Sequence, residues 1–307
     1  MLQVQENVPL APLTTFQVGG NARYFFEATT DSDIHRAVMW AQEQGVPFVV
    51  IAGGSNILWS DAGFDGLVVR ICTMDYAFDK GVLHVGAGCD LLTIIRLAAE
   101  RRLGGWEKLA GIPGSVGGAI RGNAGAFGSE IKDFITTIEA FNVRTHETKT
   151  FLPPEAAFAY RNSYFKAHPE WIILRASFVL NVIGAGEGES LITNTIAERE
   201  RRHLQNVKAA GSYFMNPVAP DAIRRQFEEE KKVTAREGRV PAGWLIEKAG
   251  MKGQTVGGAQ ASEQHPNYII NTGTAAAADV LALADKIKSA VKEQFGVTLQ
   301  EEAVYLS

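Results

Sequence analysis

The stretch Ala110-Gly-Ile-Pro-Gly-Ser-Val-Gly-Gly-Ala-Ile-Arg-Gly-Asn-Ala-Gly-Ala-Phe-Gly128 contains seven glycines in nineteen positions. We expect neither a helix nor an ordinary strand from this run, because glycine loses much backbone entropy on folding and offers no side chain to pack. Glycine instead lets backbone N–H groups approach a flat or anionic ligand closely, where a Cβ would collide. The run therefore predicts a loop that holds a ligand by its backbone.

A second glycine-rich turn, Ala52-Gly-Gly-Ser-Asn-Ile-Leu58, directly follows the apolar run Pro47–Ile51. Two such turns in one chain predict a large cofactor that the backbone holds at two places. The donors suited to a phosphate are the backbone N–H groups of Gly53, Gly54, Ser55 and Asn56. A tight structural turn explains the second pattern equally well, because short glycine motifs often occur without a ligand.

Two common nucleotide sites are disfavoured. Neither turn has the GxGxxG spacing of a dinucleotide-binding Rossmann domain, and neither carries the Gly-Lys-Ser/Thr of a P-loop. Without that lysine and hydroxyl, a triphosphate and its magnesium ion have no clamp. We therefore expect neither nicotinamide in a Rossmann domain nor ATP hydrolysis.

Composition sets the outer limits. The chain has 307 residues, of which 46% are hydrophobic and 21% charged, and its formal net charge is −4. These values are typical of a globular protein with two or three packed subdomains and argue against nucleic-acid binding, which needs a basic face. Cys72 and Cys89 have no metal or disulfide spacing and are expected to be buried free thiols, with no metal site. The N-terminus resembles no secretory signal, and no apolar run is long enough for a membrane span, so a cytoplasmic location is expected.

Periodicity and end signals predict the main elements. Helices are expected over 29–45, 91–103, 191–205, 221–238 and 274–295. Strands are expected over 46–51, 67–71, 82–85, 171–180 and 297–306, and a hairpin over 135–143 and 148–152. The helix at 221–238 is highly charged and should face solvent. The polar turn Gly184–Glu189 marks an expected subdomain boundary.

Three segments place polar residues among apolar neighbours: Tyr160-Arg-Asn-Ser-Tyr164, Gly211-Ser-Tyr-Phe-Met-Asn-Pro217 and Leu299-Gln-Glu-Glu-Ala303. Each one alone has a structural explanation, such as a surface arginine, a turn serine or a solvated acid pair. In a strand, Glu301 and Glu302 would point to opposite faces, so at most one of them shares the buried side.

Together these motifs resemble those of the UDP-N-acetylenolpyruvoylglucosamine reductase family (MurB), and the resemblance runs from about Pro12 to the C-terminus. The short spacing between Arg161 and Ser212 is similar to that of the shorter, type II members. The motifs that carry the resemblance are Leu13–Gly20, Ala52–Leu58 with Gly63–Gly66, Gly111–Gly118 with Asn123–Gly128, Tyr160–Ser163, Gly211–Ser212 with Asn216–Pro217, Ala242–Glu247, Gly257–Ala259 and the terminal acid.

The resemblance implies an α+β fold with a FAD-binding module of the vanillyl-alcohol-oxidase (PCMH) type and a smaller α+β substrate-binding domain. The module would span 1–185 as two subdomains, about 1–72 and 73–185, and the substrate-binding domain would span 186–297. A C-terminal strand at 298–307 would return to the FAD-binding module.

The resemblance also implies the reaction. NADPH would reduce FAD, and the flavin would reduce the enolpyruvyl group of UDP-GlcNAc-enolpyruvate to give UDP-N-acetylmuramate for peptidoglycan synthesis. The implied cofactor-binding residues are Gly53, Gly54, Ser55, Asn56, Ile57, Leu58, Gly111, Pro113, Gly114, Ser115, Gly118, Asn123 and Gly125.

By the same resemblance, Arg161 and Glu302 would stabilise the enolate that hydride addition creates, and Ser212 would protonate its C2 carbon. The expected substrate-binding residues are Asn216, Tyr160, Lys208 and Gln264. The expected partners are NADPH and this small-molecule substrate, with no nucleic acid or membrane, and a monomer is expected.

Some positions depart from the family pattern. Met215 and Val304 stand where basic residues are common, Arg121 is unusual in the glycine loop, and the charged segment 218–239 resembles an insertion. Two alternatives stay open: another FAD oxidoreductase of the same fold, or a flavin- or nucleotide-sugar-binding regulator without catalysis.

Overall fold

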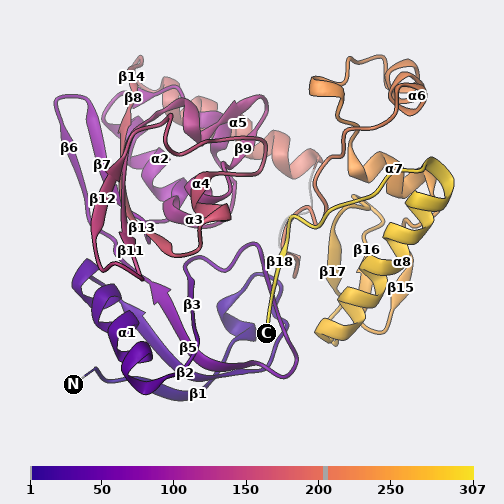
Figure 1. Cartoon of the computed structure of the whole chain (residues 1–307). Coiled ribbons are helices and arrows are strands. Elements are labelled where there is room, and N and C mark those ends of the chain that lie inside the picture. The colour runs from indigo at the N-terminus through magenta and orange to yellow at the C-terminus, as the bar shows by residue number, and fades with distance from the viewer. Residues whose placement is uncertain (1, 203–206) are drawn as a thin grey trace. The chain divides into compact units, whose positions relative to one another are not determined.

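The computed structural model describes residues 2–202 and 207–307, and the chain forms two compact units (Figure 1). The first unit comprises Met1–Val8, Ala22–Gly54 and Asp65–Arg201. The second comprises Pro9–Asn21, Ser55–Phe64 and Arg202–Ser307. The predicted limits at 1–185 and 186–297 stay a prediction.

The first unit contains two main sheets. A four-stranded sheet has the order β1 (Gln5–Pro9), β2 (Asn21–Ala28), β5 (Phe64–Ile71) and β3 (Phe48–Ile51). A five-stranded antiparallel sheet has the order β12 (Thr148–Phe151), β11 (Ile135–Asn142), β13 (Trp171–Val179), β7 (Val82–Gly86) and β6 (Tyr76–Asp79). The predicted hairpin is confirmed as β11 and β12, and the predicted strands at 46–51, 67–71, 82–85 and 171–180 lie in β3, β5, β7 and β13.

Polar side chains cap the first two helices of this unit at their N-termini. In α1 (Asp31–Gln44), Thr30 and Asp33 form a capping box, and Gly45 ends the helix with φ +64°. In α2 (Leu91–Glu100), the Asp90 side chain accepts a hydrogen bond from Thr93 N. The remaining elements are α3 (Val116–Arg121), α4 (Tyr164–Ala167), α5 (Glu187–Arg202), the short pairs β8 (Leu103–Gly104) with β14 (Asn181–Val182) and β9 (Gly125–Ala126) with β10 (Ser129–Glu130), and the 3-10 turns Glu107–Leu109 and Ile131–Asp133.

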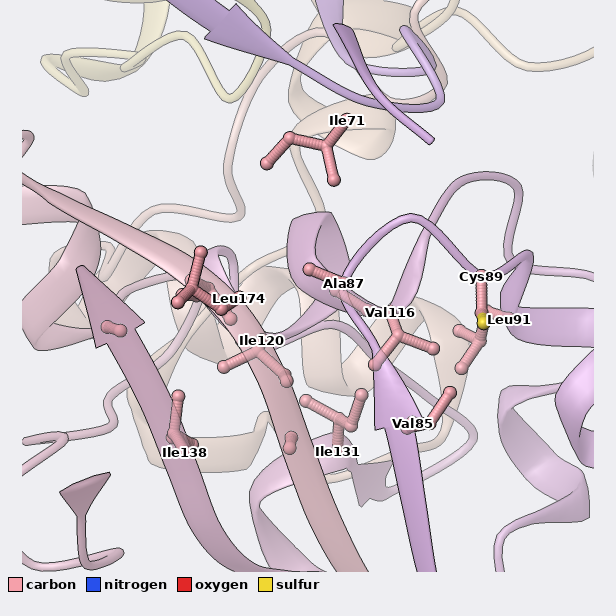
Figure 2. Close-up of a cluster of buried hydrophobic side chains, with 14 of the residues drawn as sticks. Ile71, Val85, Ala87, Cys89, Leu91, Val116, Ile120, Ile131, Ile138 and Leu174 are labelled. Atoms are coloured by element: carbon pink, nitrogen blue, oxygen red, sulfur yellow. The ribbon is translucent and has the colours of Figure 1, made fainter. Parts of the chain in front are cut away.

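The glycine run corrects one expectation, because α3 forms inside it. Ser115 caps this helix by accepting a hydrogen bond from Gly118 N, while Val116 and Ile120 are fully buried (Figure 2). A glycine in a helix costs about 1 kcal/mol relative to alanine, whereas burial of one valine or isoleucine side chain contributes about 1.5–3 kcal/mol. Core packing at two positions therefore outweighs the cost of Gly117 and Gly118. Their core neighbours in Figure 2 include Val85, Ala87, Ile131, Ile138 and Leu174.

The second unit packs helices against a small sheet. Strands β15 (Thr255–Val256), β16 (Ala259–Ala261) and β17 (Ile269–Asn271) form an antiparallel sheet, on which α8 (Ala277–Phe295) packs. The strand β18 (Val304–Leu306) pairs in parallel with β4 (Ile57–Trp59), so the C-terminal tail joins the segment that follows the second glycine turn. The other elements are α6 (Asp221–Lys231), α7 (Ala242–Lys248) and the 3-10 turns Ala11–Leu13 and Arg236–Gly238.

Several other predicted elements have different limits. The helix expected over 221–238 ends at Lys231, because Lys232 adopts a left-handed conformation with φ +53°. Its Phe227 is also buried against Trp244, so the segment does not face solvent on every side. The helix expected over 191–205 begins earlier, at Glu187, and positions 203–205 lie outside the described residues.

The strand expected over 297–306 is limited to β18, and Glu301 makes only an isolated bridge with Phe214. Cys89 is buried as expected, whereas Cys72 is only half-buried. Among the described residues, the helices include none that combines the length and the apolar character needed to cross a bilayer.

Candidate active site

The two glycine-rich turns meet within the first unit. A Cβ on Gly53 would lie 2.9 Å from Gly114 Cα and 3.2 Å from Ser115 N, so the backbones approach closely only because Gly53 has no side chain. Gly54 and Gly114 have φ values of +63° and +118°, which L side chains rarely adopt. Glycine is therefore required for this junction by both space and backbone conformation.

Beyond Gly114, α3 presents a bare face. Gly118 is exposed, and a Cβ there would meet only Ser115 Oγ, at 3.4 Å. Gly122 lies four residues further along the same face, and a Cβ there would meet only Gly118 O, at 3.5 Å. The face is a cradle that side chains would fill, and a flat ligand can lie against its backbone.

The other predicted cofactor-binding residues of the glycine-rich loop differ in how far they are buried. Pro113 is exposed, and a Cβ on Gly111 would lie 3.0 Å from Arg199 Cδ of α5. Asn123 is fully buried, and its amide donates to Glu130 Oε2 at 3.1 Å and to Ala159 O at 2.9 Å. The side-chain N–H groups of Asn123 are therefore used in hydrogen bonds that stabilise the loop.

Arg161 lies in a tight turn that is anchored to the glycine loop. Ala159 and Asn162 pair as an isolated bridge, and Arg161 has φ +54° at the tip of that turn. Its Nη2 donates to Gly125 O at 3.1 Å, and Ser163 Oγ donates to Arg121 O at 2.7 Å. Together with the Asn123–Ala159 bond, these contacts fix the guanidinium against the glycine loop.

Tyr160 lies beside Arg161 in this turn. The guanidinium carbon of Arg161 is 5.3 Å from the centroid of the Tyr160 ring, a cation–π distance. The aromatic ring therefore limits the directions that the Arg161 side chain can take.

Ser212 and Glu302 are brought together in the second unit. Glu302 N donates to Tyr213 O at 2.8 Å, and Met215 N donates to Gln300 O at 2.9 Å, so the segment after Ser212 runs beside the tail. Ser212 and Glu302 are both half-buried. Among the described residues, the Ser212 hydroxyl has no hydrogen-bond partner, so it is available to a ligand.

The two terminal acids have different surroundings. Glu301 is exposed, and its Oε1 lies 2.6 Å from Lys288 Nζ. The Glu301 carboxylate is therefore engaged in an ion pair. Glu302 is the more buried of the two, and its carbonyl oxygen accepts a hydrogen bond from Asn56 Nδ2 at 2.9 Å. The contrast favours Glu302 as the acid that faces a site.

Asn56, Ile57 and Leu58 have a structural part in the second unit. Asn56 O accepts a hydrogen bond from Val304 N at 3.0 Å, and Ile57 and Leu58 pair with Val304 and Tyr305. The segment thereby holds the tail that carries Glu302. Ser55 lies at the start of this segment and is half-buried.

The predicted substrate-binding residues of the second unit have different contacts. Asn216 Oδ1 accepts from Ala242 N at 3.0 Å, at the start of α7, and Asn216 O accepts from Arg239 Nη1 at 3.0 Å. Gln264 is exposed in a turn where its N–H donates to Ser262 Oγ at 3.1 Å. Lys208 is exposed and lines a shallow hollow with Val207, Ile270, Asn271, Thr272 and Gly273.

Asn267 is a site residue that the sequence analysis missed. It is buried, its Nδ2 donates to Phe214 O at 2.8 Å, and its Oδ1 accepts from Phe214 N at 3.0 Å. Its carbonyl also accepts from Tyr213 N at 2.7 Å. These three bonds fix the two residues that follow Ser212. The available signal was an amide directly before the apolar run Tyr268–Ile270.

The sheets, helices and backbone cradle define an α+β protein of the FAD-binding class. A family model described as a FAD binding domain matches residues 22–148, and the model for the UDP-N-acetylenolpyruvoylglucosamine reductase C-terminal domain matches residues 202–306. The predicted α+β fold with a FAD-binding module is confirmed.

Relatives that match over the full length of the chain belong to the same family as the C-terminal family model. The chain is 36% identical to a UDP-N-acetylenolpyruvoylglucosamine reductase of Solibacter usitatus over 305 residues, covering 99% of this chain and 97% of the relative. It is 38% identical to one of Carboxydothermus hydrogenoformans over 308 residues, covering 99% and 94%. The chain therefore belongs to the UDP-N-acetylenolpyruvoylglucosamine reductase family.

A solved structure is also similar over its whole length. The crystal structure of UDP-N-acetylenolpyruvylglucosamine reductase from Thermus caldophilus has a TM-score of 0.79 to this chain, with 30% sequence identity and 100% coverage of both chains. The likeness covers both the FAD-binding part and the C-terminal part.

Proposed function

We propose that the protein is an NADPH-dependent flavoenzyme that reduces UDP-GlcNAc-enolpyruvate to UDP-N-acetylmuramate. The family membership supports the activity, and one observation supports the site: the 2.8 Å bond from Glu302 N to Tyr213 O holds the terminal acid beside the segment of Ser212. Neither a non-catalytic binder nor a purely structural protein needs a proton donor and an acid held in this way.

The bare face of α3 and its junction with Gly53 fit a large, flat cofactor with a phosphate group. We propose that Gly53, Gly54 and Ser55 hold the FAD pyrophosphate by their backbone N–H groups, and that Gly111, Pro113, Gly114, Ser115 and Gly118 lie along the flavin. When bound, FAD would accept a hydride from NADPH and deliver it to C3 of the enolpyruvyl double bond. Asn123 and Gly125 would act by holding the loop and the Arg161 turn.

Hydride addition at C3 leaves negative charge on C2 and on the adjoining carboxylate, as an enolate. The Arg161 guanidinium would stabilise that charge, and Glu302 in its protonated form would donate a hydrogen bond to the enolate oxygen. Ser212 would transfer its hydroxyl proton to C2, which completes the addition of two hydrogens across the double bond. The Ser212 oxygen would regain a proton from solvent.

Further residues of each unit would contribute to substrate binding. Tyr160 would position the Arg161 side chain, and Asn216, Lys208 and Gln264 would contact the sugar or diphosphate. Arg239 donates to the carbonyl of Asn216, so this arginine lies close to the position where Met215 lacks a positive charge. We also propose that the enzyme works in the cytoplasm as a monomer.

Product analysis in D2O tests the proposed reaction. Purified protein with NADPH and UDP-GlcNAc-enolpyruvate should form UDP-N-acetylmuramate with deuterium at C2, because the donor hydroxyl exchanges with solvent. The proposal fails if NADPH is not consumed in a substrate-dependent way. A flavin oxidase of the same fold would instead consume oxygen at a rate independent of this substrate.

A further inference from the structure

Arg121 is the one charged residue in the glycine-rich stretch Ala110–Gly128, and the proposed reaction gives it no part. It is the last residue of α3, and its backbone carbonyl accepts the Ser163 hydrogen bond. That bond uses only the backbone, so it would form with any residue at this position. The guanidinium therefore needs a separate explanation.

The surroundings of the Arg121 side chain favour an anionic ligand. The residue is half-buried, and burial lowers its pKa from the usual arginine value. Within the described parts of the chain, its guanidinium has neither an ion pair nor a hydrogen bond. A partly desolvated cation without a counterion is costly, so an anion that reaches it gains a strong electrostatic contact.

Its position on the helix defines where that anion would lie. Gly118 is exposed and Arg121 and the C-cap Gly122 are half-buried, whereas Val116, Gly117, Ala119 and Ile120 are buried. Arg121 follows Gly118 by three residues and therefore lies next to it on the helix surface. Arg121 thus borders the bare glycine face rather than the core.

Arg121 and the proposed phosphate site lie at opposite ends of α3. Gly114 meets Gly53 two residues before α3 begins, and Arg121 is the last residue of α3, whose length from Val116 to Arg121 is roughly 7.5 Å at about 1.5 Å rise per residue. At that end lies the turn of Arg161, which the Ser163 bond to Arg121 O holds in place. A substrate that contacts Arg161 must also touch the hydride donor, so the flavin ring would lie at this end.

We propose that Arg121 places a positive charge beside the bound isoalloxazine ring and stabilises the negative charge that the ring gains on reduction. This inference rests on the proposed function, because it requires FAD on the face of α3. Transfer of a hydride from NADPH adds two electrons and one proton to the ring and releases NADP⁺. One net negative charge remains on the ring, and a nearby cation lowers its energy.

The test uses the FAD-loaded enzyme without substrate. Sulfite adds to flavin N5 through a new N–S bond and leaves a negative charge on the ring, so its affinity reports a nearby cation. We expect Arg121→Gln to weaken sulfite binding by about tenfold or more, and to lower the two-electron midpoint potential by about 30 mV per tenfold change. Arg121→Lys should retain most of the wild-type values. Arg96→Gln, an exposed position on α2, is the matched control and should change neither.

The possible outcomes are distinct. Unchanged sulfite affinity and potential in Arg121→Gln would overturn the inference, as would a change limited to substrate affinity. If Arg121→Gln loses oxidised FAD while Arg121→Lys keeps it, the positive charge contacts the diphosphate rather than the ring, which is neutral before reduction, and the inference fails. If both variants are folded and lose FAD, side-chain shape rather than charge matters and the inference fails. A wild-type protein that takes up no FAD would instead refute the proposed function itself.

Discussion

A serine hydroxyl is a weak acid, so Ser212 can protonate only a strongly basic carbon that is held close to it. The enolate carbon of the proposed reaction meets the first condition. The second depends on Asn267, whose side chain makes two hydrogen bonds to the Phe214 backbone, and on Tyr213, whose carbonyl accepts from Glu302 N. Burial raises the pKa of the Tyr213 phenol, as does the charge of Glu301, so this phenol stays neutral.

Replacement of Ser212 by alanine tests this role. We expect Ser212→Ala to leave flavin reduction by NADPH unchanged and to slow reoxidation by substrate by about 10²–10⁴-fold, the usual contribution of a general acid. Stopped-flow absorbance of each half-reaction measures both rates. Ser289→Ala, an exposed serine on α8, is the control and should match wild type. An unaffected reoxidation rate in Ser212→Ala would refute the assignment.

At this scale the sequence indicated some contacts and not others. The three polar segments around Arg161, Ser212 and Glu302 were recognisable as motifs. The sequence left open which of Glu301 and Glu302 shares the buried side, and the ion pair of Glu301 with Lys288 depends on tertiary packing. Asn267 was missed because nothing in the chain around it indicates that its amide bonds a backbone segment 53 residues away.

Among the elements, α3 is where local reasoning failed. The glycine count argued against a helix, but the Ser115 cap and the burial of Val116 and Ile120 decide the outcome. Those burials arise from the sheet strands β7 and β13, which the local sequence of the loop does not contain. The helices α1, α2 and α8 were predictable because their periodicity is local.

Two adjacent glycines of α3 should respond in opposite ways to a methyl group. A Cβ on Gly117 would lie 2.8 Å from Ala87 Cβ, so Gly117→Ala should destabilise the protein by about 1–3 kcal/mol. Gly118→Ala has open space and should keep or slightly raise stability, yet weaken FAD binding by about tenfold, or 1.4 kcal/mol. Urea unfolding and FAD titration measure the two effects. Wild-type FAD affinity in Gly118→Ala would show that the flavin does not lie on this face.

The capping box of α1 predicts an acid-dependent stability. Burial alone would raise the pKa of Asp33, but hydrogen bonds from Arg36, Thr30 and Thr29 lower it to about 2. Because the folded pKa lies below the unfolded value of about 3.9, this stabilisation is present above pH 4 and is lost as the pH falls towards 2.

Asp33→Asn should therefore cost about 1 kcal/mol at pH 7, and the cost should shrink at pH 3. Urea unfolding at both pH values measures it. The exposed Asp65→Asn serves as the control, because Asp65 pairs with Arg23 at the surface. An equal cost for Asp33→Asn at both pH values would show that ionisation of Asp33 is not the cause.

On the scale of the whole molecule, the chain consists of two units whose residues interleave along the sequence. Pro9–Asn21 and Ser55–Phe64 belong to the same unit as the C-terminal part. Composition and periodicity do not predict such interleaving, because it depends on the pairing of β4 with β18. The motif order, in contrast, predicted the family that the full-length relatives show.

The proposed function requires that one protein couple NADPH oxidation to substrate reduction through FAD. An anaerobic titration of the FAD-loaded enzyme tests it most directly, with the visible absorbance of oxidised flavin as the signal. We predict that one equivalent of NADPH per flavin abolishes this absorbance and that one equivalent of UDP-GlcNAc-enolpyruvate then restores it without oxygen. Flavin that NADPH reduces but that stays reduced until oxygen is admitted would contradict the account.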